Sequence, residues 1–324
     1  MKEVRLSVPA HLHAGNPDLT GDLGRLYGTL GFTIDYPQTV VTVRQSKEIE
    51  VKGKDNENAN LYARSFLEKF NINRGAEIIV EKSIPKHLGM GSQTALSLGI
   101  GTALSKIYGI DDVSVEEMAL KLERGTVTAL GTYGFKVGGL ILDGGFRIDK
   151  KGKMIPPLIF RKDIPGNWFF VVCIPKAPIP KILKIKENEN EFLNNLKPME
   201  KEVSAELSRL VLMQILPSFV EGDLITFGKA LTKFNSRLGG FWSDFQENSI
   251  YCDPIVENGI KLMLEKGAPC ACQTCWGPTF YTIVEGEKTA KMLHNEMKKY
   301  ILKAGGGEVF YTKANNKGAN ISYT

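Results

Sequence analysis

The sequence predicts an α+β protein built from two closely associated halves. Residues 1–45 are rich in strand and turn patterns, as at Arg5–Val8, where polar and apolar residues alternate. The strand Ala76–Glu81 runs through a glycine-rich loop into a helix that continues to about Tyr108. Near the end, the strand Thr279–Val284, a helix and the strand Glu308–Lys313 follow one another.

The other elements of the first half follow from periodicity and from turn residues. Ser114 and Glu117 have the spacing of a capping box, which predicts a helix over Ser114–Leu122. The remaining expected elements are strands at Phe32–Ile34 and Val40–Val43, a helix at Ala59–Phe70, and a hairpin over Gly138–Ile148 that turns at Asp143–Gly145.

A stretch rich in Lys, Gly and Pro, Lys150–Gly166, is the best candidate for a domain boundary. We therefore predict one domain over residues 1–160 and a second over residues 161–324. The second half is expected to contain the strand Trp168–Ile174 and helices at Met199–Leu216, Gly222–Phe234, Pro254–Lys266 and Lys288–Lys303. The charged runs Lys181–Lys186 and Lys186–Glu191 are interpreted as solvent-facing and as a surface loop.

Composition narrows the class of protein. The chain has 324 residues and a net charge of +5, which suits an acidic metabolite, but no dense Lys/Arg stripe that would predict nucleic-acid binding. No signal-peptide pattern and no run of about 18 apolar residues stands out, so no membrane segment is expected. Five cysteines, an odd count, do not suggest a secreted disulfide framework. A cytoplasmic location is the default expectation.

The segment Pro85–Ser92 carries the strongest functional signal. Gly89 and Gly91 would let backbone amides approach an anion closely, and the helix that starts near Ser92 would add its unpaired N–H groups. Ser92 and Thr94 could add hydroxyl groups. A plain strand-to-helix turn is the more common explanation of a lone Gly-x-Gly, and the Gly-Lys-Ser/Thr ending of a Walker loop is absent.

Three ordered motifs make the pattern more specific. Pro85-x-x-x-Gly-Met-Gly-Ser92 resembles the phosphate loop of the GHMP kinase superfamily, and Pro9–His13 resembles its first motif. The segment from Gly267 to Pro278, between a helix and a strand, resembles the third. The resemblance implies a GHMP-kinase fold with an N-terminal half like ribosomal protein S5 and a ferredoxin-like C-terminal half.

One position departs from the kinases of this superfamily. Many carry Ser-Gly-x-Asp followed at fixed spacing by Gly-Gly, and the aspartate serves the attacking hydroxyl. Here Thr128–Gly131 fills that stretch, with Gly138–Gly139 at the expected spacing, so Gly131 stands where the carboxylate would act. Because a general base typically contributes about 10²–10⁴-fold, an ATP-dependent small-molecule kinase is the alternative rather than the leading hypothesis. A non-catalytic ligand sensor is a third possibility.

The sequence more closely resembles β-ribofuranosylaminobenzene 5′-phosphate synthase, the methanopterin-pathway enzyme of this fold. The residues that carry the resemblance are Leu12–His13, Asp18–Arg25, Gly131–Phe135, Asp143–Gly145 and Gln273–Pro278, where Thr274 and Cys275 replace two serines. The resemblance implies decarboxylating transfer of phosphoribose from 5-phosphoribosyl 1-diphosphate to 4-aminobenzoate or 4-hydroxybenzoate, which releases diphosphate and CO₂. Which acid is used stays open.

The resemblance also implies roles for individual residues, for a metal and for partners. The expected catalytic residues are Asp18, Arg25 and His13, and Mg²⁺ is expected as cofactor, held by Asp18 or Ser92. The expected substrate-binding residues are Gly89, Met90, Gly91, Ser92, Gln93, Thr94, Tyr133, Lys136 and Trp276. Small-molecule substrates and a homodimer are expected, without nucleic-acid or membrane partners. Turn, ion-pair and core roles are the plain structural alternatives for these side chains.

Cys270, Cys272 and Cys275 form a Cys-x-Cys-x-x-Cys pattern that could begin a zinc or iron–sulfur site. A fourth ligand is not evident, since Cys252 is distant in the sequence. Whether these cysteines bind a metal stays open at this point.

Overall fold

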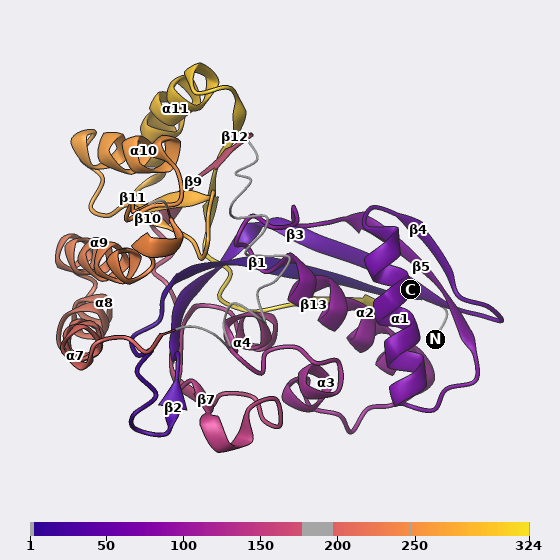
Figure 1. Ribbon diagram of the computed structural model, residues 1–324. Helices are drawn as coiled ribbons and strands as arrows, with labels where there is room; N and C mark the ends of the chain where they lie inside the picture. Colours follow the sequence, from indigo (N-terminus) through magenta and orange to yellow (C-terminus); the bar gives the residue numbers. More distant parts are fainter. Residues whose placement is uncertain (1–2, 177–196, 247, 324) are drawn as a thin grey trace.

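The computed structural model describes residues 3–176, 197–246 and 248–323. Its described residues form two large sheets with helices packed against both, together with a small two-stranded sheet, which confirms the predicted α+β class (Figure 1). The charged runs predicted as a solvent-facing stretch and a surface loop, Lys181–Lys186 and Lys186–Glu191, lie outside the described residues.

The first sheet has seven strands and is organised around the long strand β3 (Thr29–Ser46). Its path runs β13-β1-β3-β5-β4, and β6 pairs with both β3 and β8. The other strands are β1 (Val4–Gly15), β4 (Glu50–Gly53), β5 (Gly75–Lys82), β6 (Leu140–Asp143), β8 (Leu158–Lys162) and β13 (Asn320–Tyr323). The two short strands expected at 32–34 and 40–43 are therefore one continuous strand.

Strand β1 changes register at Pro9, and this change shapes the site. Pro9 pairs with Gln38 but Ala10 pairs with Ile34, so the partner strand bulges between these two pairs. Proline lacks a backbone N–H and is tolerated in sheets mainly at such irregularities. Because β13 covers only residues 4–7 of β1, the following residues, His11–Gly15, keep one edge open toward the loops of the site.

The described part of the first half contains four α-helices: α1 (Asn56–Lys69), α2 (Ser92–Tyr108), α3 (Val115–Lys121) and α4 (Leu130–Lys136). Helices α1, α2 and α4 contact the strands of the first sheet and lie over one of its faces (Figure 1). The capping box predicted at Ser114 and Glu117 is confirmed, because each side chain bonds the backbone N–H of the other residue. The helix from Ser92 to Tyr108 is also confirmed.

The hairpin predicted over Gly138–Ile148 is wrong. Strand β6 ends at Asp143, but β7 (Phe146–Arg147) leaves the sheet and pairs with β2 (Arg25–Leu26). Asp143 explains the turn, because its buried carboxylate accepts the N–H groups of Ala129 and Gly145. Burial raises the pKa of Asp143 to about 6, although these bonds favour its charged form.

The second sheet is antiparallel, in the order β10-β11-β9-β12. Its strands are β9 (Trp168–Pro175), β10 (Cys272–Gln273), β11 (Phe280–Glu285) and β12 (Gly307–Lys313). Every residue of β9 is buried, as expected for a strand covered on both faces. Residues 158–162 and 320–323 belong to the first sheet, so the division at 160/161 falls inside β8 and stays a prediction.

Helices of the second half cover both faces of this sheet. They are α7 (Lys201–Leu210), the π-helical turn η2 (Val211–Ile215), α8 (Leu216–Glu221), α9 (Leu224–Phe241), α10 (Pro254–Glu265) and α11 (Glu287–Lys303). Two short 3₁₀ turns, η1 (Ile148–Lys150) and η3 (Ser243–Phe245), complete the elements. Among the described helices, the continuous stretch Lys201–Glu221 is long and apolar enough to cross a membrane, but it is 44% buried in its most apolar window and contacts α9, as a core helix does.

A shared aromatic core joins the two sheets. Phe32 of β3 packs against Phe170 of β9, Tyr281 of β11 and Phe227 of α9, with ring centroids 5.6, 6.1 and 6.2 Å away. All four side chains are fully buried. Because each ring comes from a different element, this cluster fixes α9 against the first sheet, and α9 carries one side of the candidate site.

We predict that Phe32→Ala lowers the free energy of unfolding by about 3–5 kcal/mol, since it removes a large side chain from a filled core. Urea denaturation at neutral pH measures this change. Leu23→Ala is the matched control, because Leu23 is 84% exposed and its loss should change stability by less than about 0.5 kcal/mol. A small effect at Phe32 would mean that the two sheets do not share this core.

Candidate active site

A cavity of about 760 Å³ lies where the open end of β1, the start of α2, the segment 123–128, the end of α9 and the loop 273–276 meet. This volume is within the range of small-molecule binding sites. Its walls are formed by residues 13–16, Tyr27, His87, 89–94, 123–128, Asn235, Leu238, Gly239, Trp242, Gln246, Ile250, Tyr251, Gln273, Cys275 and Trp276.

The loop between β5 and α2 has the geometry of an anion-binding turn. His87, Gly89 and Gly91 have φ angles of 61°, 73° and 76°, so the chain turns back repeatedly before the helix starts at Ser92. The first intrahelical bond runs from the Ala95 N–H to the Gly91 carbonyl. The N–H groups of the first turn are therefore left for a ligand, and no acidic residue lies there to repel an anion.

The two glycines of this loop are required by close packing as well as by φ. A Cβ atom on Gly89 would lie 2.6 Å from the Thr274 carbonyl oxygen, and one on Gly91 would lie 2.0 Å from the His11 ring. A larger side chain at position 91 would therefore collide with His11 and displace the loop before it reached a bound anion.

His11 and His13 are two residues apart on β1, so their side chains lie on the same face of the strand. Desolvation by burial is the main reason why the pKa of His11 is lowered to about 3, and the charge of the nearby His13 lowers it further. Desolvation also lowers the pKa of His13 to about 4. His13 lines the cavity. Its ring is therefore neutral at pH 7, so it can donate and accept hydrogen bonds but brings no positive charge.

A buried polar network holds β1, the phosphate loop and the C-terminal half together. The Thr274 hydroxyl accepts the His13 N–H at 2.8 Å and donates to the Gly89 carbonyl at 2.8 Å. The Asn235 amide donates to the carbonyls of Ala14 and Gln273 at 2.9 and 3.0 Å. Both bonds of Thr274 use its hydroxyl group, so this position needs a side chain that carries one.

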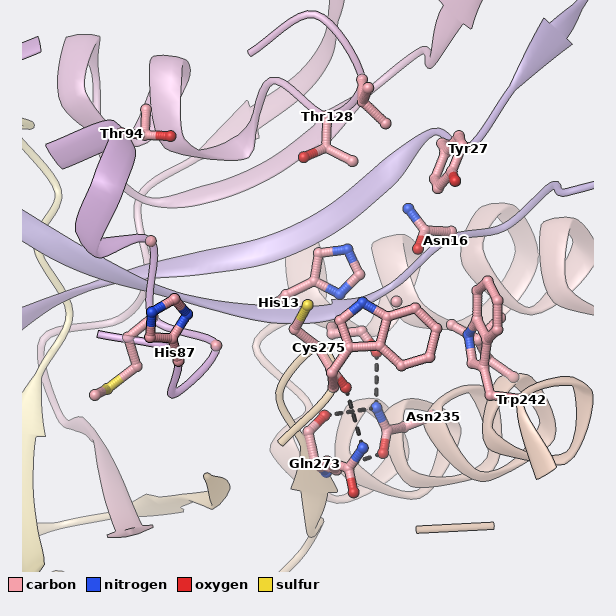
Figure 2. A pocket seen from close by; sticks show the side chains of 18 of the residues that line it. His13, Asn16, Tyr27, His87, Thr94, Thr128, Asn235, Trp242, Gln273 and Cys275 are labelled. Atoms are coloured by element: carbon pink, nitrogen blue, oxygen red, sulfur yellow. Dashed lines mark hydrogen bonds between the residues drawn. The ribbon is translucent and has the colours of Figure 1, made fainter. Parts of the chain in front are cut away.

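The opposite end of the cavity is aromatic. Trp242 and Trp276 meet nearly edge to face, with ring centroids 4.6 Å apart, and Tyr27 and Tyr251 also line the wall. Figure 2 shows Trp242 beside Asn235 on the right, His13 in the middle, Thr94 at the upper left, and Thr128 above His13, between Thr94 and Tyr27. The cavity therefore offers backbone N–H groups at one end and flat apolar surfaces at the other.

The structure brings together some of the predicted site residues. His13, the segment from Gly89 to Thr94 and Trp276 all line the cavity. Residues that sequence reasoning did not single out also line it, among them Tyr27, Arg124 and Trp242. The chain has three tryptophans, and two line the cavity; that rarity is the one sequence signal that could have identified Trp242.

Four predicted residues do not line the cavity. The Asp18 carboxylate accepts the amide and hydroxyl of Thr20 within its own turn, and Arg25 donates to the carbonyls of Gly144 and Gly145. The hydroxyl of Tyr133 donates to the Pro156 carbonyl, and Lys136 pairs with Glu116. Their predicted roles in the reaction stay predictions.

Asp18 nevertheless has a structural link to the cavity. Its backbone exchanges two hydrogen bonds with Tyr27, at 3.1 and 2.7 Å, and Tyr27 lines the wall. Asp18 therefore positions an aromatic wall residue through the main chain. Arg25 starts β2, two residues before Tyr27, and fastens the same loop to the Asp143–Gly145 turn.

Gly131 stands where many kinases of this superfamily carry a carboxylate, and neighbouring side chains occupy the space beside it. A Cβ atom at Gly131 would lie 2.9 Å from the Cγ2 of Thr94 and 3.2 Å from the His11 ring. Position 131 therefore does face the phosphate-loop helix, as in the kinase pattern, but it has no room for an aspartate.

The cysteine pattern does not form a metal site among the described residues. Cys270 and Cys272 are buried in the core, and the described residues contain no group of three or more His, Cys, Asp or Glu side chains that could hold a metal.

Comparisons with known proteins agree with this geometry. Residues 59–135 match the family described as GHMP kinases N terminal domain. The chain is 30% identical to β-ribofuranosylphenol 5′-phosphate synthase of Archaeoglobus fulgidus over 98% of this chain and 99% of the relative. It is 27% identical to the synthase of the same name from Methanothermobacter thermautotrophicus, over 98% of each chain. The chain belongs to the β-ribofuranosylphenol 5′-phosphate synthase family.

Solved structures confirm the fold. Homoserine kinase from Cytophaga hutchinsonii superposes with a TM-score of 0.72 at 17% identity, covering 99% of this chain and 98% of that one. Mevalonate diphosphate decarboxylase from Enterococcus faecalis gives 0.64 at 14% identity, covering 100% and 99%. The predicted GHMP-kinase fold and the predicted synthase family are both confirmed, and the chain is an enzyme of that family.

The pKa of His13 leads to a prediction about stability. Its folded value of about 4 lies below the ordinary 6.5, so between these pH values the unfolded chain binds a proton that the folded one does not. Stability is therefore lost as the pH falls from 6.5 toward 4. His13→Asn, which cannot titrate, should gain about 1–2 kcal/mol relative to the wild type between pH 7 and pH 5.

Urea denaturation of both proteins at the two pH values measures this difference. The opposite contribution of Asp143, whose pKa is raised to about 6, is present in both proteins and cancels. A difference that does not change with pH would show that the folded protein protonates His13 as readily as the unfolded chain does.

Proposed function

We propose that this protein catalyses decarboxylating phosphoribosyl transfer from 5-phosphoribosyl 1-diphosphate to 4-hydroxybenzoate. The products are a β-C-riboside 5′-phosphate, diphosphate and CO₂, in the first committed step of methanopterin biosynthesis. One observation supports this most: a single cavity has an open helix N-terminus at one end and paired tryptophans at the other. A diphosphate and an aromatic acid need such opposite surroundings.

The start of α2 suits the departure of diphosphate. When the bond between C1 of the ribose and the diphosphate oxygen breaks, its electron pair goes to the leaving group and positive charge develops on the ribose. Fixed N–H groups at residues 89–94 would stabilise the growing negative charge without having to reorient. This arrangement would lower the barrier for bond breaking rather than merely bind substrate.

The aromatic end suits the second half of the reaction. The ring carbon that bears the carboxylate would form the new bond to C1, and the para oxygen would stabilise the resulting cation. Loss of CO₂ then returns the bonding electrons to the ring, so no external electron sink is needed. Trp242 and Trp276 would hold the ring, and the neutral His13 could accept the hydrogen bond of the para hydroxyl. The name of the relatives, a ribofuranosylphenol phosphate synthase, favours the phenol over the amine.

We also propose Mg²⁺ as cofactor, where it would neutralise part of the diphosphate charge. Mg²⁺ takes oxygen ligands and commonly uses only one or two protein groups beside substrate phosphates. Ser92, at the first position of α2, is placed for this role, whereas Asp18 would have to leave its bonds to Thr20. Glu123 is the acidic side chain among the described residues of the cavity wall.

The kinase alternative is less well supported. Its catalytic carboxylate has no counterpart at Gly131, and Thr94 and His11 fill the space. We further propose a cytoplasmic location and a homodimer, both from the family resemblance alone.

The proposed reaction predicts release of labelled CO₂ when the protein is incubated with 5-phosphoribosyl 1-diphosphate, Mg²⁺ and carboxyl-labelled 4-hydroxybenzoate. The 4-amino acid, tested in parallel, should react more slowly. Substituting ATP plus homoserine or mevalonate should give no phosphorylated product. Phosphorylation without any CO₂ release would instead favour the kinase.

Asp18→Asn tests the predicted part of Asp18 in catalysis. Asparagine can still accept the Thr20 amide, so the turn should persist, and loss of the charge should lower kcat with little change in KM. Asp22→Asn is the matched control in the same loop, since Asp22 is paired with Lys201 on the surface. Steady-state kinetics and thermal unfolding separate the outcomes: normal kinetics with a lower Tm would leave Asp18 a purely structural role.

A further inference from the structure

Arg124 is held on the cavity wall by a tightly specified turn. The backbone N–H of Arg124 donates to the Ala119 carbonyl at 2.7 Å, where α3 ends. Gly125 then takes a φ of 74°, and a Cβ atom there would lie 2.3 Å from the Thr132 hydroxyl. No larger residue fits this position without a shift, so the turn that presents Arg124 is built into the fold.

The guanidinium of Arg124 has no strong partner among the described residues. It donates to Gln93 Oε1 at 3.3 Å and to the Tyr62 hydroxyl at 3.2 Å, both neutral and both at the long end of the hydrogen-bond range. The central guanidinium carbon, Cζ, lies 5.1 Å from the centre of the Tyr62 ring. Its Nε atom is buried and has no hydrogen-bond partner. Within the described parts of the chain, no carboxylate forms a salt bridge with it.

An unpaired buried donor is costly, and a cation on a cavity wall attracts an anion. Arg5 of the same half is better satisfied, since it forms two bonds of 2.9 Å to the Glu81 carboxylate. Arg124 therefore retains donors for a partner that enters the cavity.

The position of Arg124 specifies which anion this would be. Gln93, which it contacts, is the second residue of α2 and lines the cavity. The guanidinium thus lies beside the unpaired N–H groups at the start of α2, where the helix dipole also favours negative charge. The planar fork of an arginine is well matched to phosphate oxygens.

We propose that Arg124 binds the diphosphate leaving group and stabilises its charge as the bond to C1 of the ribose breaks. The electron pair of that bond goes to the diphosphate oxygen, and no proton moves to or from the guanidinium, which stays charged. This inference rests on the proposed function for the identity of the donor substrate.

Calorimetric titration with inorganic diphosphate and Mg²⁺ tests the proposal directly. Arg124→Gln should weaken diphosphate binding at least about tenfold and lower kcat about 10²–10³-fold, with binding of 4-hydroxybenzoate unchanged. Arg124→Lys should recover part of the affinity, because it keeps the charge but loses the fork. Arg64→Gln removes the same charge from the exposed side of α1, where Arg64 bonds Asn60, and should behave like the wild type.

Thermal unfolding of each variant shows that it is folded before titration. If the folded Arg124→Gln protein binds diphosphate as tightly as the wild type, or if the wild type binds none, the assignment of Arg124 is overturned. The proposed function is judged separately, by release of labelled CO₂ from the wild-type protein. Turnover by the wild type together with normal diphosphate binding by Arg124→Gln would refute the inference and leave the function standing.

Discussion

The open edge of β1 is the feature on which the rest of the site depends. Beyond Ser7, where pairing with β13 ends, the edge of this strand that points away from β3 faces loops instead of a neighbouring strand. The His11 N–H is taken by the Met90 carbonyl, the His13 N–H by Thr274, and the Ala14 carbonyl by Asn235. Each such group left unpaired in a buried place would cost about 1–3 kcal/mol. Satisfying them fixes the phosphate loop and the C-terminal half on the same few residues.

This arrangement explains why the site can combine two unlike environments. The phosphate loop is anchored to one part of the open edge, and the loop that carries Trp276 is anchored to the next part through Thr274. The distance between the anion end and the aromatic end is thus set by neighbouring residues of one strand. A substrate with a diphosphate and a second substrate with a ring would then be held close together in one cavity, which favours bond formation between them.

Sequence reasoning succeeded where the signal was local. The loop at residues 85–92 needs glycines, a following helix and no acidic residue in its first turn, and all of these can be read along the chain. It failed where long-range contacts decide. Asp143 was expected in a hairpin turn. Instead its carboxylate accepts the N–H groups of Ala129 and Gly145, and β7 pairs with β2. Arg124 and Trp242 come from separate elements and meet at the cavity only in the folded chain.

Asp18 and Arg25 show a further limit of the same kind. Their charges suggested contact with substrate, whereas the structure shows them organising a loop, one through the backbone of Tyr27 and the other through the Gly144 and Gly145 carbonyls. A charged side chain in a glycine-rich segment can serve either purpose, since the same hydrogen bonds that bind a ligand can close a turn. Only the partners distinguish the two, and partners are not visible in one sequence.

The substitution at position 131 fits the proposed chemistry better than it fits a kinase. A kinase must deprotonate or orient a hydroxyl group, and its carboxylate does this work. In the proposed transfer the nucleophile is a ring carbon, and the electrons that restore aromaticity come from the bond to the departing CO₂, so no base is needed at that place. Gly131 instead leaves room for Thr94 and His11 to pack together beside the phosphate loop. In the proposed reaction the loop before α2 would still bind phosphate groups, while the space of a kinase's general base is occupied by Thr94 and His11.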